Sequence, residues 1–349
     1  MISYFITFFI AVIFALLFTP IAIMLAEKWG ILDYPGERRV HKVPIPRLGG
    51  AAIYLSFWLA VFLRADINNV IIGIFLGSTV IFVVGIVDDM KGVRPQYKLF
   101  WQLLAALVPI AFGLTVPDLV TLPLIGQVRL GGLGYAFAIF WIVGLVNTVN
   151  ISDGLDGLAA GICFIAALIL FWSASRIGQP AAFLMLALAG VALGFLFFNS
   201  NPAKIFMGDS GSMFLGYIIG TVSIWGLLKT ATIVGVVFPL LVLGMPLTDV
   251  VFAIIRRKWK GLSIVRADRG HLHHRLLDAG LNQRQAVFIL YIISACFGLA
   301  AILYDYGYWY IALALVIVNL GIILIIIFRK FNLNKYIWKK KIYVKNRGE

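Results

Sequence analysis

The chain contains few charged residues. Asp, Glu, Lys and Arg make up 13% of its 349 residues and 62% are hydrophobic, whereas a soluble domain carries about 25% charged residues. So few polar side chains cannot cover a water-soluble globule of this size, and lipid is the expected solvent. The chain also has only two cysteines. Cys163 and Cys296 both fall in apolar runs, which predicts reduced, buried thiols and no structural disulfide.

Long apolar runs fill most of the chain, and each is close to the about 17–25 residues that a membrane-spanning helix needs. The first run is too long for the apolar core of a signal peptide and has no basic segment before it, so we expect it to be a retained span. The sequence predicts an all-α polytopic membrane protein with about eleven transmembrane helices, forming a single catalytic domain over 1–328 and a basic tail over 329–349. The runs are 2–25, 48–64, 69–87, 99–117, 134–150, 157–175, 180–198, 211–228, 232–255, 286–303 and 308–328.

The basic residues alternate between the two sides of these predicted spans. Of the 29 Lys and Arg residues, 25 fall in alternate connections and in the tail, and the other side keeps only Arg64, Arg129, Arg176 and Lys229. The positive-inside rule then places the N-terminus outside and the C-terminus in the cytoplasm. We therefore expect a multi-pass protein of the bacterial cytoplasmic (inner) membrane.

The net charge and the segment 117–134 allow two further expectations. The net charge of +14 does not predict nucleic-acid binding, because no soluble domain is present to carry such a surface. The basic tail is expected to contact anionic lipid headgroups. On the outer side, the Pro- and Gly-rich segment 117–134 is expected to form a small hairpin that caps the bundle.

The few acids gather where the hydrophobic runs break. Asp88 and Asp89 form one pair, Asp153 and Asp156 form another, and Asp209 lies at a third break. An ionised carboxylate near the hydrocarbon edge is costly and usually functional. All five lie on the predicted cytoplasmic side, which indicates one site that holds a divalent cation and handles phosphates.

Structural roles compete with this interpretation at each position. Asp88, Asp89 and Asp209 are placed where helix caps occur. Asn147 and Asn150 precede Asp153 at three-residue spacing and would form a polar stripe if the helix continued. A calcium-binding EF-hand loop is disfavoured because its alternating acids and distal Glu are missing around Asp153.

Three of the four histidines lie together in the longest basic loop, at His271, His273 and His274. A zinc site is disfavoured because no Cys or neighbouring Glu completes a tetrahedral set locally. Imidazoles and guanidinium groups, including Arg269, suit a pyrophosphate better. His41 lies in another basic loop and would by itself be a solvated histidine.

One acid, Asp249, falls inside an apolar run rather than at a break. We expect it to pair with Arg256 or Arg257, and Pro246 just before it predicts a kinked helix.

With these segments taken together, the chain resembles the polyprenyl-phosphate N-acetylhexosamine-1-phosphate transferases of the WecA/TagO type, which are related to the phospho-MurNAc-pentapeptide translocases. The resemblance covers roughly Asp33 to Arg284. It rests on five motifs: D-D-M-K-G-V-R-P from Asp88, N-x-x-N-x-x-D-G-L-D-G-L from Asn147, F-M-G-D-S-G-S from Phe206, H-x-x-P-x-P-R-x-G-G from His41 and H-L-H-H from His271.

The resemblance implies a reaction on the cytoplasmic face. UDP-N-acetylglucosamine (UDP-GlcNAc) would give its sugar-1-phosphate to undecaprenyl phosphate and release UMP, in a membrane step of teichoic acid or O-antigen synthesis. The cofactor implied is Mg²⁺, with Mn²⁺ as a substitute. The partners implied are UDP-GlcNAc, undecaprenyl phosphate and membrane lipids, and no nucleic acid; the sequence leaves a homodimer open.

The resemblance also implies residue roles. Asp209 and Asp153 would hold the metal, Asp88 beside Asp89 would orient or deprotonate the lipid phosphate, and Asp156 would line the nucleotide pocket. A covalent phospho-aspartyl route through Asp88 or Asp209 stays open. The implied substrate-binding residues are Lys98, Asn147, Asn150, Phe206, Arg269, His271, His273, His274 and His41.

Three other functions compete with this one. Relatives of this type act on other UDP-N-acetylhexosamines, and the sister enzymes use UDP-MurNAc-pentapeptide, although their His-rich loop is arranged differently. A transporter is disfavoured because alternating access predicts polar residues at the bilayer midplane, whereas most polar residues here gather at one face.

Overall fold

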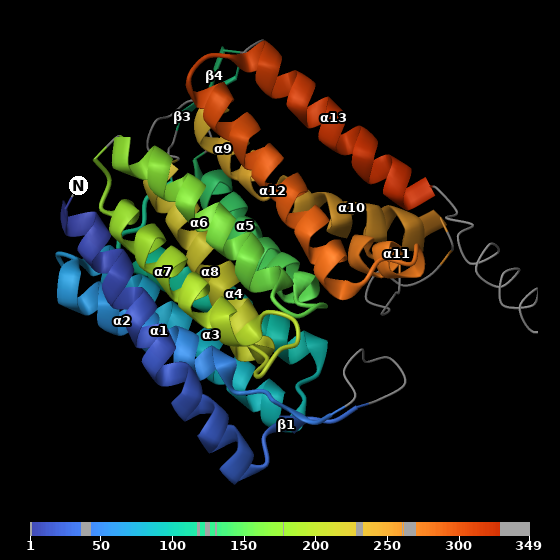
Figure 1. Cartoon of the computed structure of the whole chain (residues 1–349). Helices are drawn as coiled ribbons and strands as arrows, with labels where there is room; N and C mark the ends of the chain where they lie inside the picture. Colours follow the sequence, from blue (N-terminus) through green and yellow to red (C-terminus); the bar gives the residue numbers. More distant parts are fainter. Residues whose placement is uncertain are drawn as a thin grey trace, which may run out of the picture.

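The computed structural model describes residues 2–35, 43–116, 119–122, 126–129, 131–176, 178–227, 233–259, 261 and 270–328. This part of the chain is a bundle of helices with two short two-stranded ladders (Figure 1). The helices are α1 (Ile2–Trp29), α2 (Gly49–Arg64), α3 (Asn69–Lys91), α4 (Pro95–Ala111), α5 (Gly132–Ser152), α6 (Leu158–Arg176), α7 (Ala181–Asn199), α8 (Gly208–Leu227), α9 (Ile233–Val242), α10 (Gly244–Trp259), α11 (Leu272–Asp278), α12 (Gln283–Asp305) and α13 (Trp309–Phe328).

The helical bundle confirms a polytopic membrane protein. Within the described residues, seven helices are long and apolar enough to cross a membrane: α1, α3, α5, α6, α7, α12 and α13. Each of the apolar runs identified in the sequence is helical over most of its length.

One predicted span is divided in the structure. The run 232–255 forms α9 and α10, with a break at Leu243. Pro246 lies in the first turn of α10 and has no N–H to donate to the carbonyl four residues earlier, so the helical hydrogen-bond pattern is interrupted next to this break. The seven-residue helix α11 was not predicted.

Two ladders accompany the bundle. Strands β3 (Leu119–Leu122) and β4 (Gly126–Arg129) pair antiparallel, which confirms the hairpin expected in this segment. Strands β1 (Leu32–Asp33) and β2 (Ile45–Pro46) also pair antiparallel. Just after β2, the backbone N–H of Arg47 donates to the carbonyl of Ile31 at 3.0 Å. The second ladder therefore brings Asp33 and Arg47 to the same end of the bundle.

Helix α8 lies at the centre of the bundle and packs against α2, α3, α5, α6 and α7. Small residues let the helices approach closely. A Cβ on Gly85 of α3 would lie 2.3 Å from Cα of Ser210 in α8, so only glycine fits there. This contact brings the last turn of α3, with Asp88 and Asp89, against the first turn of α8, with Asp209.

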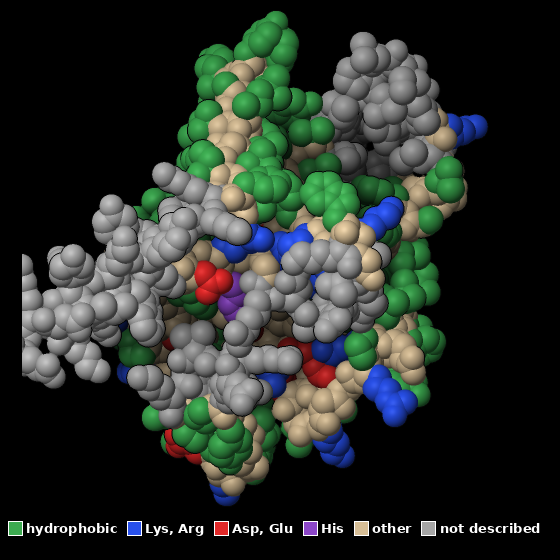
Figure 2. Space-filling view, turned by 90° about the vertical axis from the view of Figure 1, so that its right-hand side faces the viewer, with side chains coloured by type: hydrophobic (Ala, Val, Ile, Leu, Met, Phe, Trp, Pro, Cys, Tyr) green, Lys and Arg blue, Asp and Glu red, His purple; other side chains and the backbone are tan. Residues whose placement is uncertain are grey.

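The C-terminal helices lie to one side of this core (Figure 1): α12 packs on α6, α9 and α13, and α11 packs on α12 and α13. Figure 2 shows acidic, basic and histidine side chains gathered around a hollowed centre of one face, with hydrophobic side chains above and below them. The five acids that the sequence singled out therefore lie at one end of the bundle, with Arg47 and Lys98.

Candidate active site

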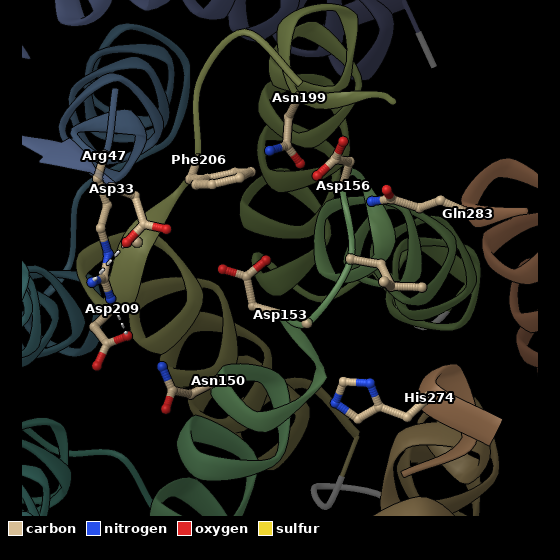
Figure 3. A pocket seen from close by; sticks show the side chains of 13 residues that line it. Asp33, Arg47, Asn150, Asp153, Asp156, Asn199, Phe206, Asp209, His274 and Gln283 are labelled. Atoms are coloured by element: carbon tan, nitrogen blue, oxygen red, sulfur yellow. Dashed lines mark hydrogen bonds and ion pairs between the residues drawn. The ribbon is translucent and has the colours of Figure 1, made fainter. Parts of the chain in front are cut away.

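A cavity of about 300 Å³ opens where α5, α8, α11 and the ladder β1–β2 converge (Figure 3). Segments far apart in the sequence therefore share one site. The cavity is lined by Asp33, Arg47, Asn150, Asp153, Gly154, Leu155, Asp156, Asn199, Phe206, Gly208, Asp209, His274 and Gln283.

Two basic side chains contact Asp209, one at each carboxylate oxygen. Nη2 of Arg47 lies 3.2 Å from Oδ1, and Nζ of Lys98 contacts Oδ2. The same ammonium lies 2.6 Å from Oδ2 of Asp88. Lys98 therefore bridges the ends of α3 and α8 and neutralises two acids that would otherwise repel each other.

Asp89 lies behind Asp209 and its side chain is fully buried. Its Oδ1 accepts the backbone N–H of Asp209 at 2.8 Å, and its Oδ2 accepts the backbone N–H of Ser210 at 3.0 Å. Nε of Arg47 lies 3.0 Å from Oδ1. This carboxylate caps the start of α8, where free N–H groups and the helix dipole favour a negative charge.

Arg47 is a central residue of the site to which the sequence interpretation gave no role. Its guanidinium faces Asp89 and Asp209, and Nη1 lies 3.8 Å from Oδ1 of Asp33. Burial alone would lower the pKa of Arg47, but these carboxylates outweigh it and raise the pKa above its ordinary value. The available signal was the motif that runs from His41 to Gly50, of which Arg47 is the one cation that the structure describes.

Asp153 ends α5 and points into the cavity (Figure 3). Among the described residues, its carboxylate accepts no hydrogen bond and forms no ion pair, in contrast to the carboxylate of Asp209. Burial, and next the nearby charge of Asp209, raise the pKa of Asp153 to about 8. One turn earlier, Nδ2 of Asn150 donates to Oγ of Ser212 at 2.9 Å, which ties α5 to α8 beside the cavity.

Asp156 shapes the opposite wall. Its Oδ2 accepts Nδ2 of Asn201 at 2.8 Å and the backbone N–H of Ala203 at 3.1 Å. Nδ2 of Asn201 also lies 2.8 Å from Oε1 of Gln283. Asp156 therefore fixes the loop that leads to Phe206, and its lining neighbours Asn199 and Gln283 are site residues that sequence reasoning missed.

The histidine segment reaches the cavity through one residue. His274 lines it, whereas His273 is buried against the turn at Gly154. Burial, and next the neighbouring His274, lower the pKa of His273 to about 4, so this imidazole is neutral at pH 7. His271 contacts Asp249.

Other predicted site residues lie beside the cavity or beyond the described part of the chain. Asp88, Asp89 and Lys98 stand behind Asp209 and are not among the lining residues. Nδ2 of Asn147 donates to Oε1 of Gln102 at 2.8 Å, which faces it toward α4. His41 and Arg269 fall outside the described residues.

Comparison with known proteins identifies the family. Residues 71–227 match the model of Glycosyl transferase family 4. A protein of Bacillus subtilis (strain 168), named a probable undecaprenyl-phosphate N-acetylglucosaminyl 1-phosphate transferase, is 38% identical over 306 residues, which cover 86% of this chain and 85% of that protein. This chain belongs to glycosyl transferase family 4. The resemblance inferred from the motifs is confirmed.

More distant members of the family are similar over most of the chain. The decaprenyl-phosphate N-acetylglucosaminephosphotransferase of Mycobacterium tuberculosis (strain ATCC 25618 / H37Rv) is 35% identical over 77% of this chain and 74% of its own length. The undecaprenyl-phosphate alpha-N-acetylglucosaminyl 1-phosphate transferase of Escherichia coli (strain K12) is 27% identical over 95% and 91%. In this glycosyl transferase, the family match spans α3 to α8 and so contains all five acids of the cluster.

The donor set of this family 4 glycosyl transferase fits a hard divalent cation. Within the described ranges, no group of three or more His, Cys, Asp and Glu side chains is arranged to chelate an ion. Mg²⁺ usually takes one or two protein carboxylates and completes its shell with water and substrate phosphate oxygens. Asp209 and Asp153, which both line the cavity, match that requirement.

Proposed function

We propose that this protein transfers N-acetylglucosamine-1-phosphate from UDP-GlcNAc to undecaprenyl phosphate, releasing UMP, in a membrane step of cell-envelope polysaccharide synthesis. The relatives above are all named as polyprenyl-phosphate N-acetylglucosamine phosphotransferases, which supports transfer of N-acetylglucosamine phosphate to a polyprenyl phosphate. The observation that carries the proposal is the junction of α3 and α8. There, at the edge of a cavity in an apolar bundle, Asp209 contacts both Arg47 and Lys98.

The reaction needs charge neutralisation more than a strong base. An oxygen of the lipid phosphate attacks the phosphorus that carries the sugar, the bond from that phosphorus to the bridging oxygen breaks, and its electron pair leaves with UMP. A phosphate monoester has a second pKa of about 6, so the acceptor is already largely dianionic at neutral pH. Two anions must therefore meet, and positioning with electrostatic stabilisation supplies most of the catalysis.

The cations of the cluster suit this task. Arg47 lines the cavity and can offer planar, paired donors to phosphate oxygens. Lys98 contacts both Asp88 and Asp209 and so fixes the positions of these two carboxylates. Asp88 also accepts the backbone N–H of Val93 at 2.5 Å. In this arrangement Asp88 orients Lys98 and, through it, the charge next to the acceptor phosphate.

Asp209 and Asp153 are the residues that would hold Mg²⁺, or Mn²⁺ in its place. When bound, the ion would neutralise the nucleotide phosphates and stabilise the departing UMP. Phe206 and Asn150, which also line the cavity, supply an apolar ring and an amide for the nucleotide. His274 faces them from α11 and offers a hydrogen bond to the sugar or diphosphate (Figure 3).

The membrane arrangement proposed with this function has eleven spans, the N-terminus outside and the C-terminus in the cytoplasm of a bacterial cell, in the cytoplasmic membrane. The distribution of Lys and Arg supports it. The cavity then opens toward the cytosol, where nucleotide sugars are made available.

The purified protein tests the proposal with undecaprenyl phosphate, Mg²⁺ and a panel of UDP-sugars. With radiolabelled UDP-GlcNAc, we expect lipid-linked sugar and UMP in equal amounts. Preference for UDP-MurNAc-pentapeptide or for another hexosamine would overturn the sugar assignment, and no transfer from any donor would overturn the reaction. Exchange of labelled UMP into UDP-GlcNAc without lipid would indicate a covalent phospho-aspartyl route in place of direct displacement.

A further inference from the structure

Asp249 is a buried acid in α10 whose two oxygens both hold the start of α11. Oδ2 lies 3.0 Å from Nδ1 of His271, and Oδ1 accepts the backbone N–H of Leu272 at 2.9 Å. The sequence had suggested Arg256 or Arg257 as its partner; the structure shows the histidine segment. An ionisable side chain in an apolar helix is costly, and this one is only 6% exposed.

Helix α10 contacts the same segment a second time, two turns further along the helix. Nη1 of Arg256 donates to the carbonyl of Gly270 at 2.8 Å. A Cβ on Gly270 would lie 2.2 Å from Cζ of this guanidinium, so the backbone must approach it closely. Residues seven apart lie on one face of a helix. One face of α10 thus fixes three consecutive residues, Gly270 to Leu272.

The contact with Asp249 also fixes the tautomer and the orientation of the His271 ring. A carboxylate on Nδ1 keeps the proton of a neutral imidazole on that nitrogen, so His271 has a fixed orientation. The helix α11 has no side-chain cap of its own, and the N–H of Leu272 would be a buried, unsatisfied donor without Asp249. Removing this acid therefore frees the start of α11.

The position of α11 decides where two other histidines stand. His273 packs on the turn after α5, where a Cβ on Gly154 would lie 2.5 Å from its Nε2. The rings of His273 and His274 have centroids 4.2 Å apart. His274 lines the cavity, and Figure 3 shows its ring directed from α11 toward the side where Asp153 lies.

We propose that Asp249 is a positioning residue for the transfer reaction: through His271 and Leu272 it fixes α11 so that His274 meets the nucleotide sugar in the cavity. Asp249 does not line the cavity, and neither do its hydrogen-bond partners His271 and Leu272. The inference rests on the proposed function, because it assigns the nucleotide sugar as the ligand of His274.

The experiment compares Asp249→Ala, Asp249→Asn, His274→Ala and the double variant Asp249→Ala/His274→Ala. Asp305→Ala is the matched control, because it breaks an ion pair with Arg176 (2.7 Å) that lies outside the cavity. For Asp249→Ala, we expect kcat/KM for UDP-GlcNAc to fall roughly ten- to a hundredfold, with KM for undecaprenyl phosphate unchanged. Asp249→Asn should lose less, since its amide oxygen still accepts the N–H of Leu272.

The double variant separates positioning from general damage. If Asp249 acts through His274, most of its effect disappears in the His274→Ala background, so the two losses are not multiplicative. Multiplicative losses, or a lower Tm with unchanged kcat/KM, would overturn the proposal.

A second measurement does not depend on the reaction. Hydrogen–deuterium exchange of the segment 270–279 should speed up in Asp249→Ala and not in Asp305→Ala. Unchanged exchange would show that Asp249 does not hold α11. If the parent protein transfers no sugar but exchange is still faster in Asp249→Ala, the proposed function is refuted, while the role of Asp249 in holding α11 stands.

Discussion

Asp89 accepts both the backbone N–H of Ser210, at 3.0 Å, and its hydroxyl, at 2.7 Å, through the same oxygen. The last turn of α3 thereby caps the first turn of α8, and the fully buried carboxylate of Asp89 also faces Arg47 at 3.0 Å. The two adjacent acids therefore differ in role: Asp89 fixes the start of α8, whereas Asp88 contacts Lys98.

Asp89→Ala is expected to destabilise the protein. It would leave the Arg47 guanidinium and the N–H groups of α8 without their shared acceptor, and removing one partner of a buried pair costs about 3–5 kcal/mol. Thermal unfolding in detergent measures the loss. Asp66→Ala, at an exposed position between α2 and α3, is the control, and an equal Tm for both variants would contradict the capping role.

Asp209→Asn is expected to abolish most of the metal-dependent activity with little change in fold. The side chains are nearly isosteric, but the variant loses the negative charge. That charge is proposed to hold the cation, and it pairs with Arg47 and Lys98. We expect transfer to fall about a hundredfold or more at matched Mg²⁺, and Mn²⁺ binding, followed by electron paramagnetic resonance, to weaken. Asp305→Asn should keep both, and parent-like Mn²⁺ binding in Asp209→Asn would refute the assignment.

Gly154→Ala is expected to disturb the contact between the turn after α5 and α11. The added Cβ would lie 2.5 Å from Nε2 of His273, so the imidazole has to move. Displacements near 1 Å in an active site can cost about a hundredfold in rate, and we expect KM for UDP-GlcNAc to rise or kcat to fall. Gly144→Ala in α5, where no atom lies within 4 Å of the added Cβ, should stay near the parent. Equal kinetics in the two variants would show that this contact does not matter.

The helices were largely predictable because hydrophobicity is a local property that adds up over about 20 residues. The division between α9 and α10 and the short helix α11 were not predicted as such. Pro246 signalled a kink, but whether a kink ends a helix depends on its neighbours. Helix α11 has seven residues, too few to show an apolar period.

The sequence indicated which acids line the candidate site, but it did not indicate which residues contact one another there. Asp153 and Asp209 stand out because ionisable residues are rare in such a chain, and both line the cavity. Arg47 did not stand out in this way, because it is one cation among several in a basic loop, and only its place in the motif from His41 to Gly50 marked it. The pairing of Asp249 with His271 joins residues 22 positions apart and depends on how α10 and α11 pack, which no local pattern encodes.

The orientation predicted from the basic residues is testable with single cysteines. Lys91→Cys, at the end of α3, and Arg129→Cys, in β4, both replace exposed residues. In intact cells, a membrane-impermeant maleimide should label the cysteine at 129 and should reach the one at 91 only after the cells are opened. Labelling of position 91 from outside would reverse the orientation and place the cavity away from cytosolic nucleotide sugars.

The raised pKa of Asp153 predicts that divalent cation binding depends on pH. Because burial and the nearby Asp209 place this pKa at about 8, the metal-free protein holds the proton at pH 7. A metal ligand must be deprotonated, so binding releases that proton. Mg²⁺ affinity should therefore increase about tenfold per pH unit from pH 6 to 8 and level off above, as for one linked proton.

The same shift has a consequence for stability, with a defined sign. The ordinary pKa of this carboxyl is 3.8, so between about pH 4 and pH 8 the folded, metal-free protein binds a proton that the unfolded chain has lost. Its free energy of unfolding should fall as pH rises through this window, and Mg²⁺ should reverse the fall. Thermal unfolding of the parent and of Asp153→Asn at several pH values, with and without Mg²⁺, tests both statements, and Mg²⁺ titration at the same pH values tests the binding. The variant has no carboxyl to titrate, so its weaker binding should not follow pH; a parent whose affinity is flat from pH 6 to 8 would remove Asp153 from the cation site.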